Sequence, residues 1–377
     1  MRNLSCNACP THRANVNLSY IRMKIYFYHT EDVQYIYDRW KRNAFPGHFL
    51  YGATHLADHG IEMVMHRHRD FATRIQTAIY TAWRILTCRE RLDAVYATHY
   101  QGLEIIIFMR ALGLFRPKTI VWLHQPVIKT GKRWRDWIGK LFYKGMDRIF
   151  LFSRKLYDDS LSTGKARPCQ MRVGHWGPDL DFYDRLMEAN PVEQRRGFIS
   201  TGRERRDFRT LVEAFNATGE QLDIYLNKKN CGLDYEALFG QMAVKGNVRL
   251  HYVSGYQQDK LCLPVHRAAC VVICCMETNY TVGFTTVVEA MALGLPIICS
   301  RNPQIPIDFD KEGCGISVPY YDTKGWADAI RHIASHPAEA AEMGRRGRLL
   351  AEKAFNDKIC AAQVAETIKE CVKGNNR

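Results

Sequence analysis

Short apolar runs alternate with longer amphipathic stretches along the first half of the chain, beginning just after Met23. The runs are rich in aromatic and β-branched residues, as buried strands are, and the stretches between them repeat apolar residues at helical spacing. The pattern therefore predicts strands that alternate with helices, which is typical of a parallel sheet covered on both faces. The expected strands are KIYFYH, GIEMVMH, DAVYATH, TIVWLHQP and RIFLFS.

The alternation breaks once and then resumes. Residues 175–197 are polar, charged and rich in turn-forming residues, so we interpret them as a linker between two domains. The fold class that follows is α/β, with two Rossmann-like parallel-sheet domains that face each other across a cleft and bind a ligand at the carboxyl ends of both sheets. The strands expected beyond the linker are GFISTG, LDIYLN, VRLHYVSG, CVVICCM, LPIICS and GISVP.

The chain is divided accordingly. Residues 1–22 are polar and are expected to be a disordered extension, which makes Met23 a candidate start. The N-terminal, acceptor-side domain is expected at 23–180 and the C-terminal, nucleotide-binding domain at 181–345. Residues 346–377 continue a helical pattern and are expected to pack back toward the N-terminal domain.

Length and charge narrow the function classes. With 377 residues the chain can form two domains, each with its own core. Its 53 Lys and Arg against 39 Asp and Glu give a net charge of +14, which favours an anionic partner such as a phosphorylated substrate or an acidic membrane surface. The basic residues are scattered and no nucleic-acid-binding motif occurs, so we expect no nucleic-acid partner.

The 13 cysteines are irregularly spaced, and the one C-x-x-C pair, Cys6 and Cys9, has no second pair to complete a zinc site. We therefore expect reduced thiols in a cytoplasmic protein and no metal ligands. No apolar run approaches the ~18 residues that would span a membrane. The first 22 residues also lack the apolar segment of a signal peptide.

A glycine–arginine turn follows the first expected strand of the second domain. In GRERRDF, Gly202 ends the strand, and Arg203, Arg205 and Arg206 stand at the start of a helix. Backbone amides, the positive end of the helix dipole and arginine side chains converge at such a junction and bind anions. A solvated basic turn is the alternative, but three arginines at one junction favour phosphate.

A matching junction lies later in the same domain, at TVGFTTVVEAMALG. Gly283 allows close backbone approach, and Thr285 and Thr286 are expected to cap the helix. Glu289 is expected in the first helical turn, where its carboxylate can accept the two hydroxyls of a ribose or merely offset the helix dipole. Together the two junctions favour a nucleotide-diphosphate site.

The residues of both junctions carry a resemblance to a known family. GRERRDFRTLVEAF followed by GFTTVVEAMALGLPIICS resembles the nucleotide-binding half of the GT-B glycosyltransferases, specifically the retaining family-4 type (glycosyl transferases group 1), over most of the second domain. The resemblance implies that Arg203 and Arg206 bind the donor diphosphate and stabilise its charge during catalysis, and that Glu289 binds the ribose. It also implies no metal and no cofactor, since the leaving diphosphate itself takes the acceptor's proton.

Three further residues follow from the resemblance. In FPGHFLYGATHL, Gly47 would let the backbone approach the donor or the acceptor. His124, at the end of TIVWLH, matches a histidine beside the donor sugar, which it would orient, although a strand-end histidine can also be structural. Tyr256 is expected near the nucleotide base.

One position departs from the family pattern. The family often has two glutamates separated by seven residues, of which the first contacts the donor sugar, but Thr281 stands in that place, eight residues before Glu289. Glu277 is the nearest upstream glutamate and is displaced by four residues. The sugar hydroxyls are therefore expected to meet the backbone amides of Val282, Gly283 and Phe284.

Two other stretches carry chemical signals. Asp179 and Asp181 form a literal D-x-D, but they lie in the expected linker and not between strands, so we discount them as metal ligands. Residues 132–148 place aromatic and aliphatic side chains on one helical stripe and basic side chains around it. Such a helix suits either the surface of an anionic membrane or a core stripe with a solvated basic face.

The function that these features favour is transfer of a sugar, with retention, from a nucleotide-diphospho-sugar to a glycan or lipid-linked acceptor. UDP-sugars are favoured over GDP-sugars by the habit of the family, and bacterial surface polysaccharide or glycolipid synthesis is the expected setting. Two alternatives stay open. A nucleotide-sugar 2-epimerase of the same fold would convert donor without acceptor, and a non-catalytic nucleotide- or glycan-binding protein would bind without turnover.

Overall fold

The computed structural model describes residues 23–202, 204–230, 232–254 and 258–374. The strands of the first half are β1 (Met23–Tyr28), β2 (Ile61–Met65), β3 (Ala94–Ala97), β4 (Lys118–Leu123), β5 (Arg148–Leu151) and β6 (Met171–Val173). Those of the second half are β7 (Phe198–Thr201), β8 (Leu222–Leu226), β9 (Lys229–Asn230), β10 (Leu233–Asp234), β11 (Val248–Tyr252), β12 (Cys270–Ile273), β13 (Ile297–Ser300) and β14 (Gly315–Val318).

Helices connect almost all of these strands. In the first half they are α1 (Val33–Lys41), η1 (Gly47–Leu50), η2 (Ala53–His59), α2 (Arg74–Leu86), α3 (Glu104–Ala111), α4 (Arg133–Lys144), α5 (Arg154–Leu161), η3 (Pro168–Gln170) and α6 (Leu180–Ala189). In the second half they are α7 (Phe208–Thr218), α8 (Tyr235–Gly240), α9 (Gln258–Arg267), α10 (Phe284–Ala292), α11 (Phe309–Glu312), α12 (Thr323–Ser335), α13 (Pro337–Lys353) and α14 (Asp357–Lys373).

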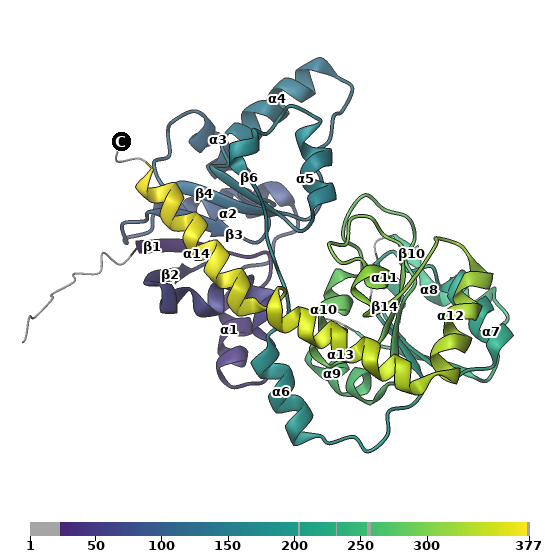
Figure 1. Ribbon diagram of the computed structural model, residues 1–377. Coiled ribbons are helices and arrows are strands. Elements are labelled where there is room, and N and C mark those ends of the chain that lie inside the picture. Colours follow the sequence, from purple (N-terminus) through teal and green to yellow (C-terminus); the bar gives the residue numbers. More distant parts are fainter. Residues whose placement is uncertain (1–22, 203, 231, 255–257, 375–377) are drawn as a thin grey trace, which may run out of the picture.

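Each half forms a six-stranded parallel sheet flanked by helices (Figure 1). The first sheet has the order β2-β1-β3-β4-β5-β6, and the second has β11-β8-β7-β12-β13-β14. The strand order reverses between β1 and β3 in the first sheet and between β7 and β12 in the second. Ligands of such sheets bind at the carboxyl ends of the strands beside these reversals. The predicted fold class, two Rossmann-like domains across a cleft, is confirmed.

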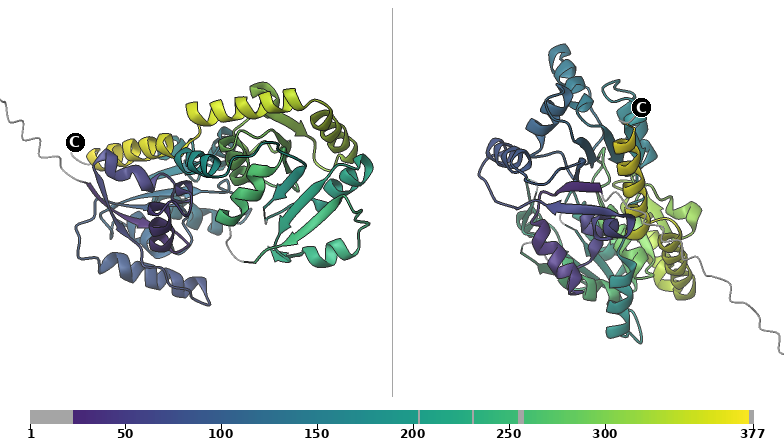
Figure 2. Two further views of the ribbon diagram at one scale, coloured as in Figure 1. Left: turned by 90° about the horizontal axis from the view of Figure 1, so that it is seen from below. Right: turned by 90° about the vertical axis from the view of Figure 1, so that its left-hand side faces the viewer.

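The C-terminal helices bind the two domains together, as the fold-class prediction required. Helix α13 packs on α10 of the second domain, and α14 crosses to the first domain, where it packs on η2 and β4. Figure 2 shows both helices along one side of the molecule. The chain passes very close to itself at their junction: a side chain at Gly177 would place its Cβ 2.1 Å from the carbonyl carbon of Phe355.

Two local expectations need correction. The stretch interpreted as a linker contains α6, because Asp179 accepts a hydrogen bond from the amide of Phe182 and so caps a helix. Helix α10 begins at Gly283, which has a left-handed φ of 88°, and no threonine hydroxyl caps it. Since the helix starts earlier than expected, Glu289 lies in its second turn.

Asp179 also anchors the loop that was expected to carry a donor-contacting glycine. Its Oδ2 accepts hydrogen bonds from the amide of Gly47 (2.8 Å) and from the indole of Trp40 (3.1 Å). A Cβ at Gly47 would lie 2.7 Å from that indole nitrogen, so close packing explains the glycine. The literal D-x-D thus begins with an aspartate that holds η1 and α6 together.

His48, the next residue of that loop, is fully buried where the two domains meet. Its Nδ1 accepts a hydrogen bond from the amide of Asp179, and its Nε2 lies 3.9 Å from Oε1 of Glu289 in the other domain. Burial lowers the pKa of His48 to about 3. The imidazole is therefore neutral in the folded protein at pH 7.

This histidine predicts a loss of stability in acid. Because the folded pKa lies below the unfolded value of about 6.5, the unfolded chain binds more protons between pH 6.5 and pH 3, and the free energy of unfolding falls as the pH drops through that window. His48→Gln keeps an acceptor but cannot titrate. We expect urea denaturation to show that the variant loses about 2 kcal/mol less than the wild type between pH 7 and pH 5.

A comparison at pH 7 separates this effect from lost packing, which would lower the stability of the variant at every pH. Parallel pH profiles for the two proteins would contradict the assignment.

Candidate functional site

A cavity of about 380 Å³ lies between the two domains, at the carboxyl ends of strands from both sheets. We call it the interdomain cavity. The first domain contributes the end of β4, the loop around η1 and the segments after β3, β5 and β6, and the second contributes the segments after β7 and β12. Its lining residues are Phe49, Tyr51, His99, His124, Gln125, Phe152, Trp176, Gly202, Glu204, Arg206 and Tyr280–Thr286.

The second-domain wall contains a buried guanidinium. Arg206 is only 3% exposed and donates to the carbonyls of Thr201 (3.2 Å) and Glu204 (3.0 Å) and to the sulfur of Cys275 (3.3 Å). Its Nε is buried without a partner, and no ion pair of the described residues involves it. A buried cation held only by neutral groups is poised for an anion.

Gly202 makes this arrangement sterically feasible. Its φ of 121° belongs to the region that favours glycine, and a Cβ there would lie 2.1 Å from Nη2 of Arg206. Gly202 and Arg206, both expected at the donor site, therefore do line the interdomain cavity. Arg203 and Tyr256, expected beside them, fall outside the described residues.

The N-terminus of α10 faces the same cavity. The amide of Phe284 donates to the carbonyl of Thr281, whereas the amides of Thr285 and Thr286 belong to the first turn and have no partner within the helix. Such amides, with the positive end of the helix dipole, form an anion-binding site. Helix α7 differs, because Asp207 caps it by accepting from the amide of Thr210.

The first-domain wall presents His124 in a defined tautomer. Its Nε2 lies 3.0 Å from the carbonyl oxygen of Thr98, which can only accept, so Nε2 carries the proton. Burial lowers the pKa of His124, and the ring is accordingly neutral at pH 7. Its Nδ1 is therefore free to accept a hydrogen bond from a ligand hydroxyl.

A second histidine stands beside it. The His99 ring lies 5.3 Å from that of His124, and its Nδ1 accepts from the amide of Gln101. Burial lowers the pKa of His99 to about 4, which makes this wall of the cavity uncharged at neutral pH. Neutral imidazoles suit a sugar better than a phosphate at this end of the cavity.

Aromatic side chains from both domains form the floor. Trp176 and Phe152 of the first domain lie 5.6 Å and 6.2 Å, between ring centroids, from Phe284 of the second. Tyr51 packs on Trp176 at 5.6 Å. Of these residues only Phe284 was predicted from the sequence, and for its backbone amide. Phe152, Trp176 and Tyr51 were not predicted, although Tyr51 and the lining residue Phe49 lie within the FPGHFLYG segment that was singled out for its glycine.

The cavity also contains a carboxylate that the sequence analysis did not select. Glu204 lines the cavity, and its Oε1 accepts a hydrogen bond from the hydroxyl of Tyr280 (2.7 Å). It lies close enough to His124 for its charge to oppose the fall of the histidine pKa. Among the lining residues it is the sole acid, and its place in the turn GRERRDF was the available signal.

Two expected donor-site residues lie elsewhere. Gly47 is buried in η1, and Glu289 is only 6% exposed in α10, where it faces His48. Neither lines the interdomain cavity. By contrast Val282, Gly283, Phe284 and Thr285 all do, together with Thr281, so the structure brings together the expected glycine turn, arginine and histidine.

Comparison with known proteins shows a likeness to glycosyltransferases. Residues 198–336 match the family described as "Glycosyl transferases group 1". A D-inositol 3-phosphate glycosyltransferase of Mycobacteroides abscessus is 26% identical over 199 residues, which cover 50% of this chain and 44% of that protein. A second curated relative, a D-inositol 3-phosphate glycosyltransferase of Saccharomonospora viridis, is matched over 20% of its length, so the chain matches less than half the length of either relative.

Solved structures match over nearly the whole chain. Sucrose-phosphate synthase of Thermosynechococcus elongatus has a TM-score of 0.67 at 18% identity, covering 94% of this chain and 100% of its own. HepE of Anabaena in complex with UDP-glucose has a TM-score of 0.61 at 14% identity, covering 92% and 100%. Residues 198–336 are therefore similar to the glycosyl transferases group 1 family, and the whole chain shares the two-domain GT-B fold of these solved structures.

Proposed function

We propose that the chain transfers a sugar, with retention, from a UDP-sugar to a glycan or lipid-linked acceptor in bacterial surface polysaccharide or glycolipid synthesis. The observation that carries this proposal is the buried guanidinium of Arg206 beside the open amides of α10, in a cavity closed on the other side by neutral histidines. The structural neighbour crystallised with UDP-glucose supports a uridine donor. GDP-sugars are the second choice.

In this proposal the donor diphosphate lies against Arg206 and the amides of Thr285 and Thr286. The bond between the sugar's anomeric carbon and the diphosphate oxygen breaks, and a bond to the acceptor hydroxyl forms on the same face of the sugar. The acceptor's proton passes to the departing diphosphate, whose growing charge is stabilised by Arg206 and the dipole of α10. Arg203 remains the predicted second cation and Glu289 the predicted ribose ligand.

The sugar itself would occupy the first-domain side of the cavity. Nδ1 of His124 accepts one of its hydroxyls, and the carboxylate of Glu204 accepts others, because a carboxylate offers several acceptor positions and no donor. Glu204 thereby supplies the acidic group that Thr281 does not. The hydroxyl of Tyr280 holds this carboxylate in position.

Glu204 should discriminate between nucleotide and nucleotide-sugar. We expect Glu204→Gln to leave the affinity for UDP within about twofold, but to weaken the correct UDP-sugar about tenfold or more, as expected for a hydrogen bond to a charged group. Calorimetry with UDP and the common UDP-sugars measures both. The double variant Glu204→Gln with Thr281→Glu, which returns a carboxylate to the same wall, should recover part of the loss.

Arg206→Gln is the matched contrast, because it should weaken UDP and UDP-sugar alike. Equal affinity of wild type and Glu204→Gln for every UDP-sugar would refute the role of Glu204, whereas failure of the wild type to bind any nucleotide would refute the transferase itself. Product analysis separates the alternatives: an epimer formed without acceptor indicates the epimerase, and binding without turnover indicates the non-catalytic protein.

We further propose that the first domain contacts the cytoplasmic surface of an anionic membrane. Helix α4 has no buried residue, and its tryptophans Trp134 and Trp137 are 61% and 67% exposed. Phe142, near the end of the helix, packs against the core, so only the first part of the apolar stripe is open to solvent. Helix α2 also exposes a stripe, formed by Ile75, Ile79, Trp83 and Leu86. Of the fourteen large apolar side chains exposed in the described residues, ten lie between Ile75 and Ile138, which concentrates them on this domain.

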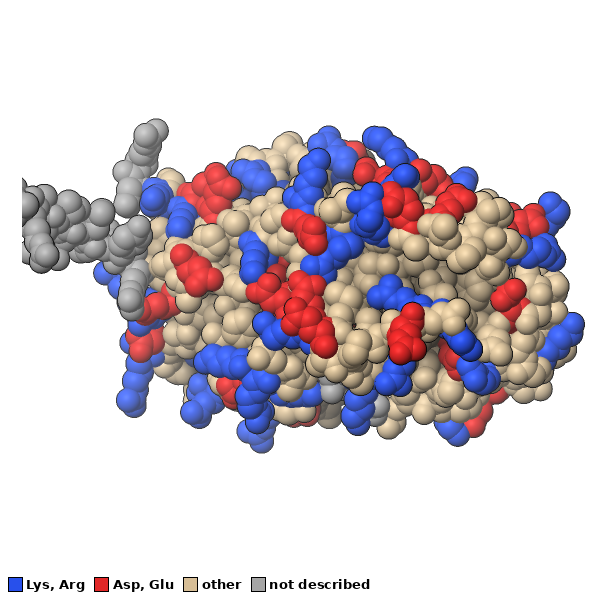
Figure 3. All heavy atoms as spheres, turned by 60° about the horizontal axis from the view of Figure 1, so that its bottom comes forward, with Lys and Arg blue, Asp and Glu red and all other residues tan. Residues whose placement is uncertain are grey.

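The charges around α4 suit an acidic surface. Lys132, Arg133, Arg135, Lys140 and Lys144 flank the stripe, and the one acid of the helix, Asp136, is paired with Lys165 at 2.7 Å. On the face shown in Figure 3, by contrast, basic and acidic side chains are interspersed. No helix within the described ranges is long and apolar enough to cross a bilayer. Contact through α4 would bring a lipid-linked acceptor toward the cavity.

Vesicle sedimentation tests this contact. Each basic residue near an anionic surface contributes about 1 kcal/mol, so reversing Lys132, Arg133 and Arg135 to glutamate should lower binding to phosphatidylglycerol vesicles at least about a hundredfold. Trp134→Ser with Trp137→Ser should also weaken it, while Leu349→Ser, which changes an exposed apolar residue of α13, should not. Binding that is unchanged by the charge reversal would refute the proposal.

A further inference from the structure

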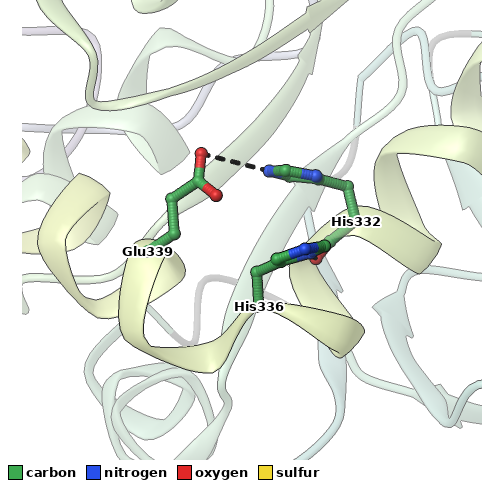
Figure 4. Close-up of side chains that lie close together, drawn as sticks. All are labelled: His332, His336 and Glu339. Carbon is green, nitrogen blue, oxygen red and sulfur yellow. Dashed lines mark hydrogen bonds and ion pairs between the residues drawn. The ribbon is translucent and has the colours of Figure 1, made fainter.

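Two histidines and a glutamate gather at the corner between α12 and α13 (Figure 4). His332 lies in the last turn of α12, His336 joins the two helices, and Glu339 lies in the first turn of α13. One nitrogen or oxygen of each lies within 4.8 Å of those of the other two. None of them lines the interdomain cavity, so the cluster has no part in the function proposed above.

Hydrogen bonds prepare the cluster for a metal ion. Nδ1 of His336 lies 2.9 Å from the carbonyl oxygen of His332, which must accept, so Nδ1 carries the proton and the lone pair is on Nε2. A backbone carbonyl that fixes the tautomer in this way is a common partner of metal-binding histidines. Nε2 of His332 lies 3.2 Å from Oε1 of Glu339, where a cation can replace the shared proton.

The rings are already close together. The centroids of His332 and His336 lie 4.6 Å apart with the planes inclined by only 25°. Zinc bonds of about 2.0–2.2 Å require the ligand atoms to approach one another to roughly 3.4 Å. All three side chains are at least partly exposed, so small rotations can bring this about without disturbing a packed core.

We propose that His332, His336 and Glu339 form a binding site for a divalent transition-metal ion of the zinc type, completed by water. Two imidazoles and one carboxylate select such an ion over magnesium or calcium, which prefer oxygen ligands. The neighbouring arginines repel a bound metal ion only weakly, because Arg331 is paired with Asp328 and Arg346 with Glu342. No cysteine takes part in this site, so the irregular cysteine spacing, which argues against a cysteine-based zinc site, does not argue against this one.

The position of this corner gives the metal a structural role. Helix α12 packs on α7, and α13 packs on α10. Helix α10 begins at the interdomain cavity, at Gly283, and α7 is capped by Asp207, the residue after the lining residue Arg206. A metal ion that ties α12 to α13 therefore braces two helices that flank the second-domain wall.

The test is zinc titration of the tag-free full chain by calorimetry, in a background where Cys6, Cys9 and Cys169 are changed to serine so that thiols do not compete. We expect one equivalent of zinc to bind, to raise the unfolding temperature, and to bind more weakly at pH 5.5 than at pH 7.5, because the ligands must be deprotonated. Cobalt substituted for zinc should give the absorption bands of a low-coordinate nitrogen–oxygen site.

His336→Ala and Glu339→Gln should each weaken zinc binding at least about tenfold. His68→Ala is the matched control, since His68 also lies beside a carboxylate, Asp70 at 3.1 Å, but has no third ligand among the residues that the structure describes. Glu339→Gln keeps the inference testable if the histidine variant does not fold. Zinc affinity that is the same in His336→Ala, Glu339→Gln and the control, or absent in the parent chain, would overturn the proposal.

Discussion

The arrangement of the strand ends in the second domain depends on the buried positive charge of Arg206. Removing a guanidinium from water costs several kcal/mol unless it is compensated. Among the described residues the compensation comes from carbonyl oxygens and a thiol, and Gly202 leaves the space that the guanidinium occupies. The end of β7, which carries Gly202, and the end of β12, which carries Cys275, must lie side by side for this. They do so because the strand order reverses between these two strands.

The same constraint explains why the site lies between the domains. The reversal in the second sheet faces the ends of β3 and β4 in the first, where burial lowers the pKa of both histidines and aromatic side chains line the cavity. Phe284, the first residue of α10, contacts Phe152 and Trp176, so the helix that offers its amides also forms one of the contacts between the domains. In the proposed function, the wall that contains Arg206 would hold the phosphates and the wall that contains His124 would face the sugar.

The fold and part of the lining of the interdomain cavity could be predicted from the sequence, for different physical reasons. Alternating apolar runs specify parallel α/β domains, so the fold could be predicted. The glycine and arginines that follow a strand also predicted that Gly202 and Arg206 would lie together, as they do at the cavity. The start of α10 could not be, because Thr285 and Thr286 are good caps and only the left-handed φ of Gly283 moves the start forward. Asp179, discounted as a metal ligand, anchors a loop more than a hundred residues earlier in the chain, a contact that no local pattern shows. Glu204 was overlooked because its neighbours were arginines.

Hydrogen–deuterium exchange of the full chain with and without UDP tests most directly whether the interdomain cavity holds the donor. We predict slower exchange in the segments around Gly202 and 281–287 and around Tyr51, on both walls of the cavity, and no such change in Arg206→Gln at the same UDP concentration. Protection confined to one domain away from the cavity, or protection that persists without Arg206, would contradict a donor held by this guanidinium and the first turn of α10.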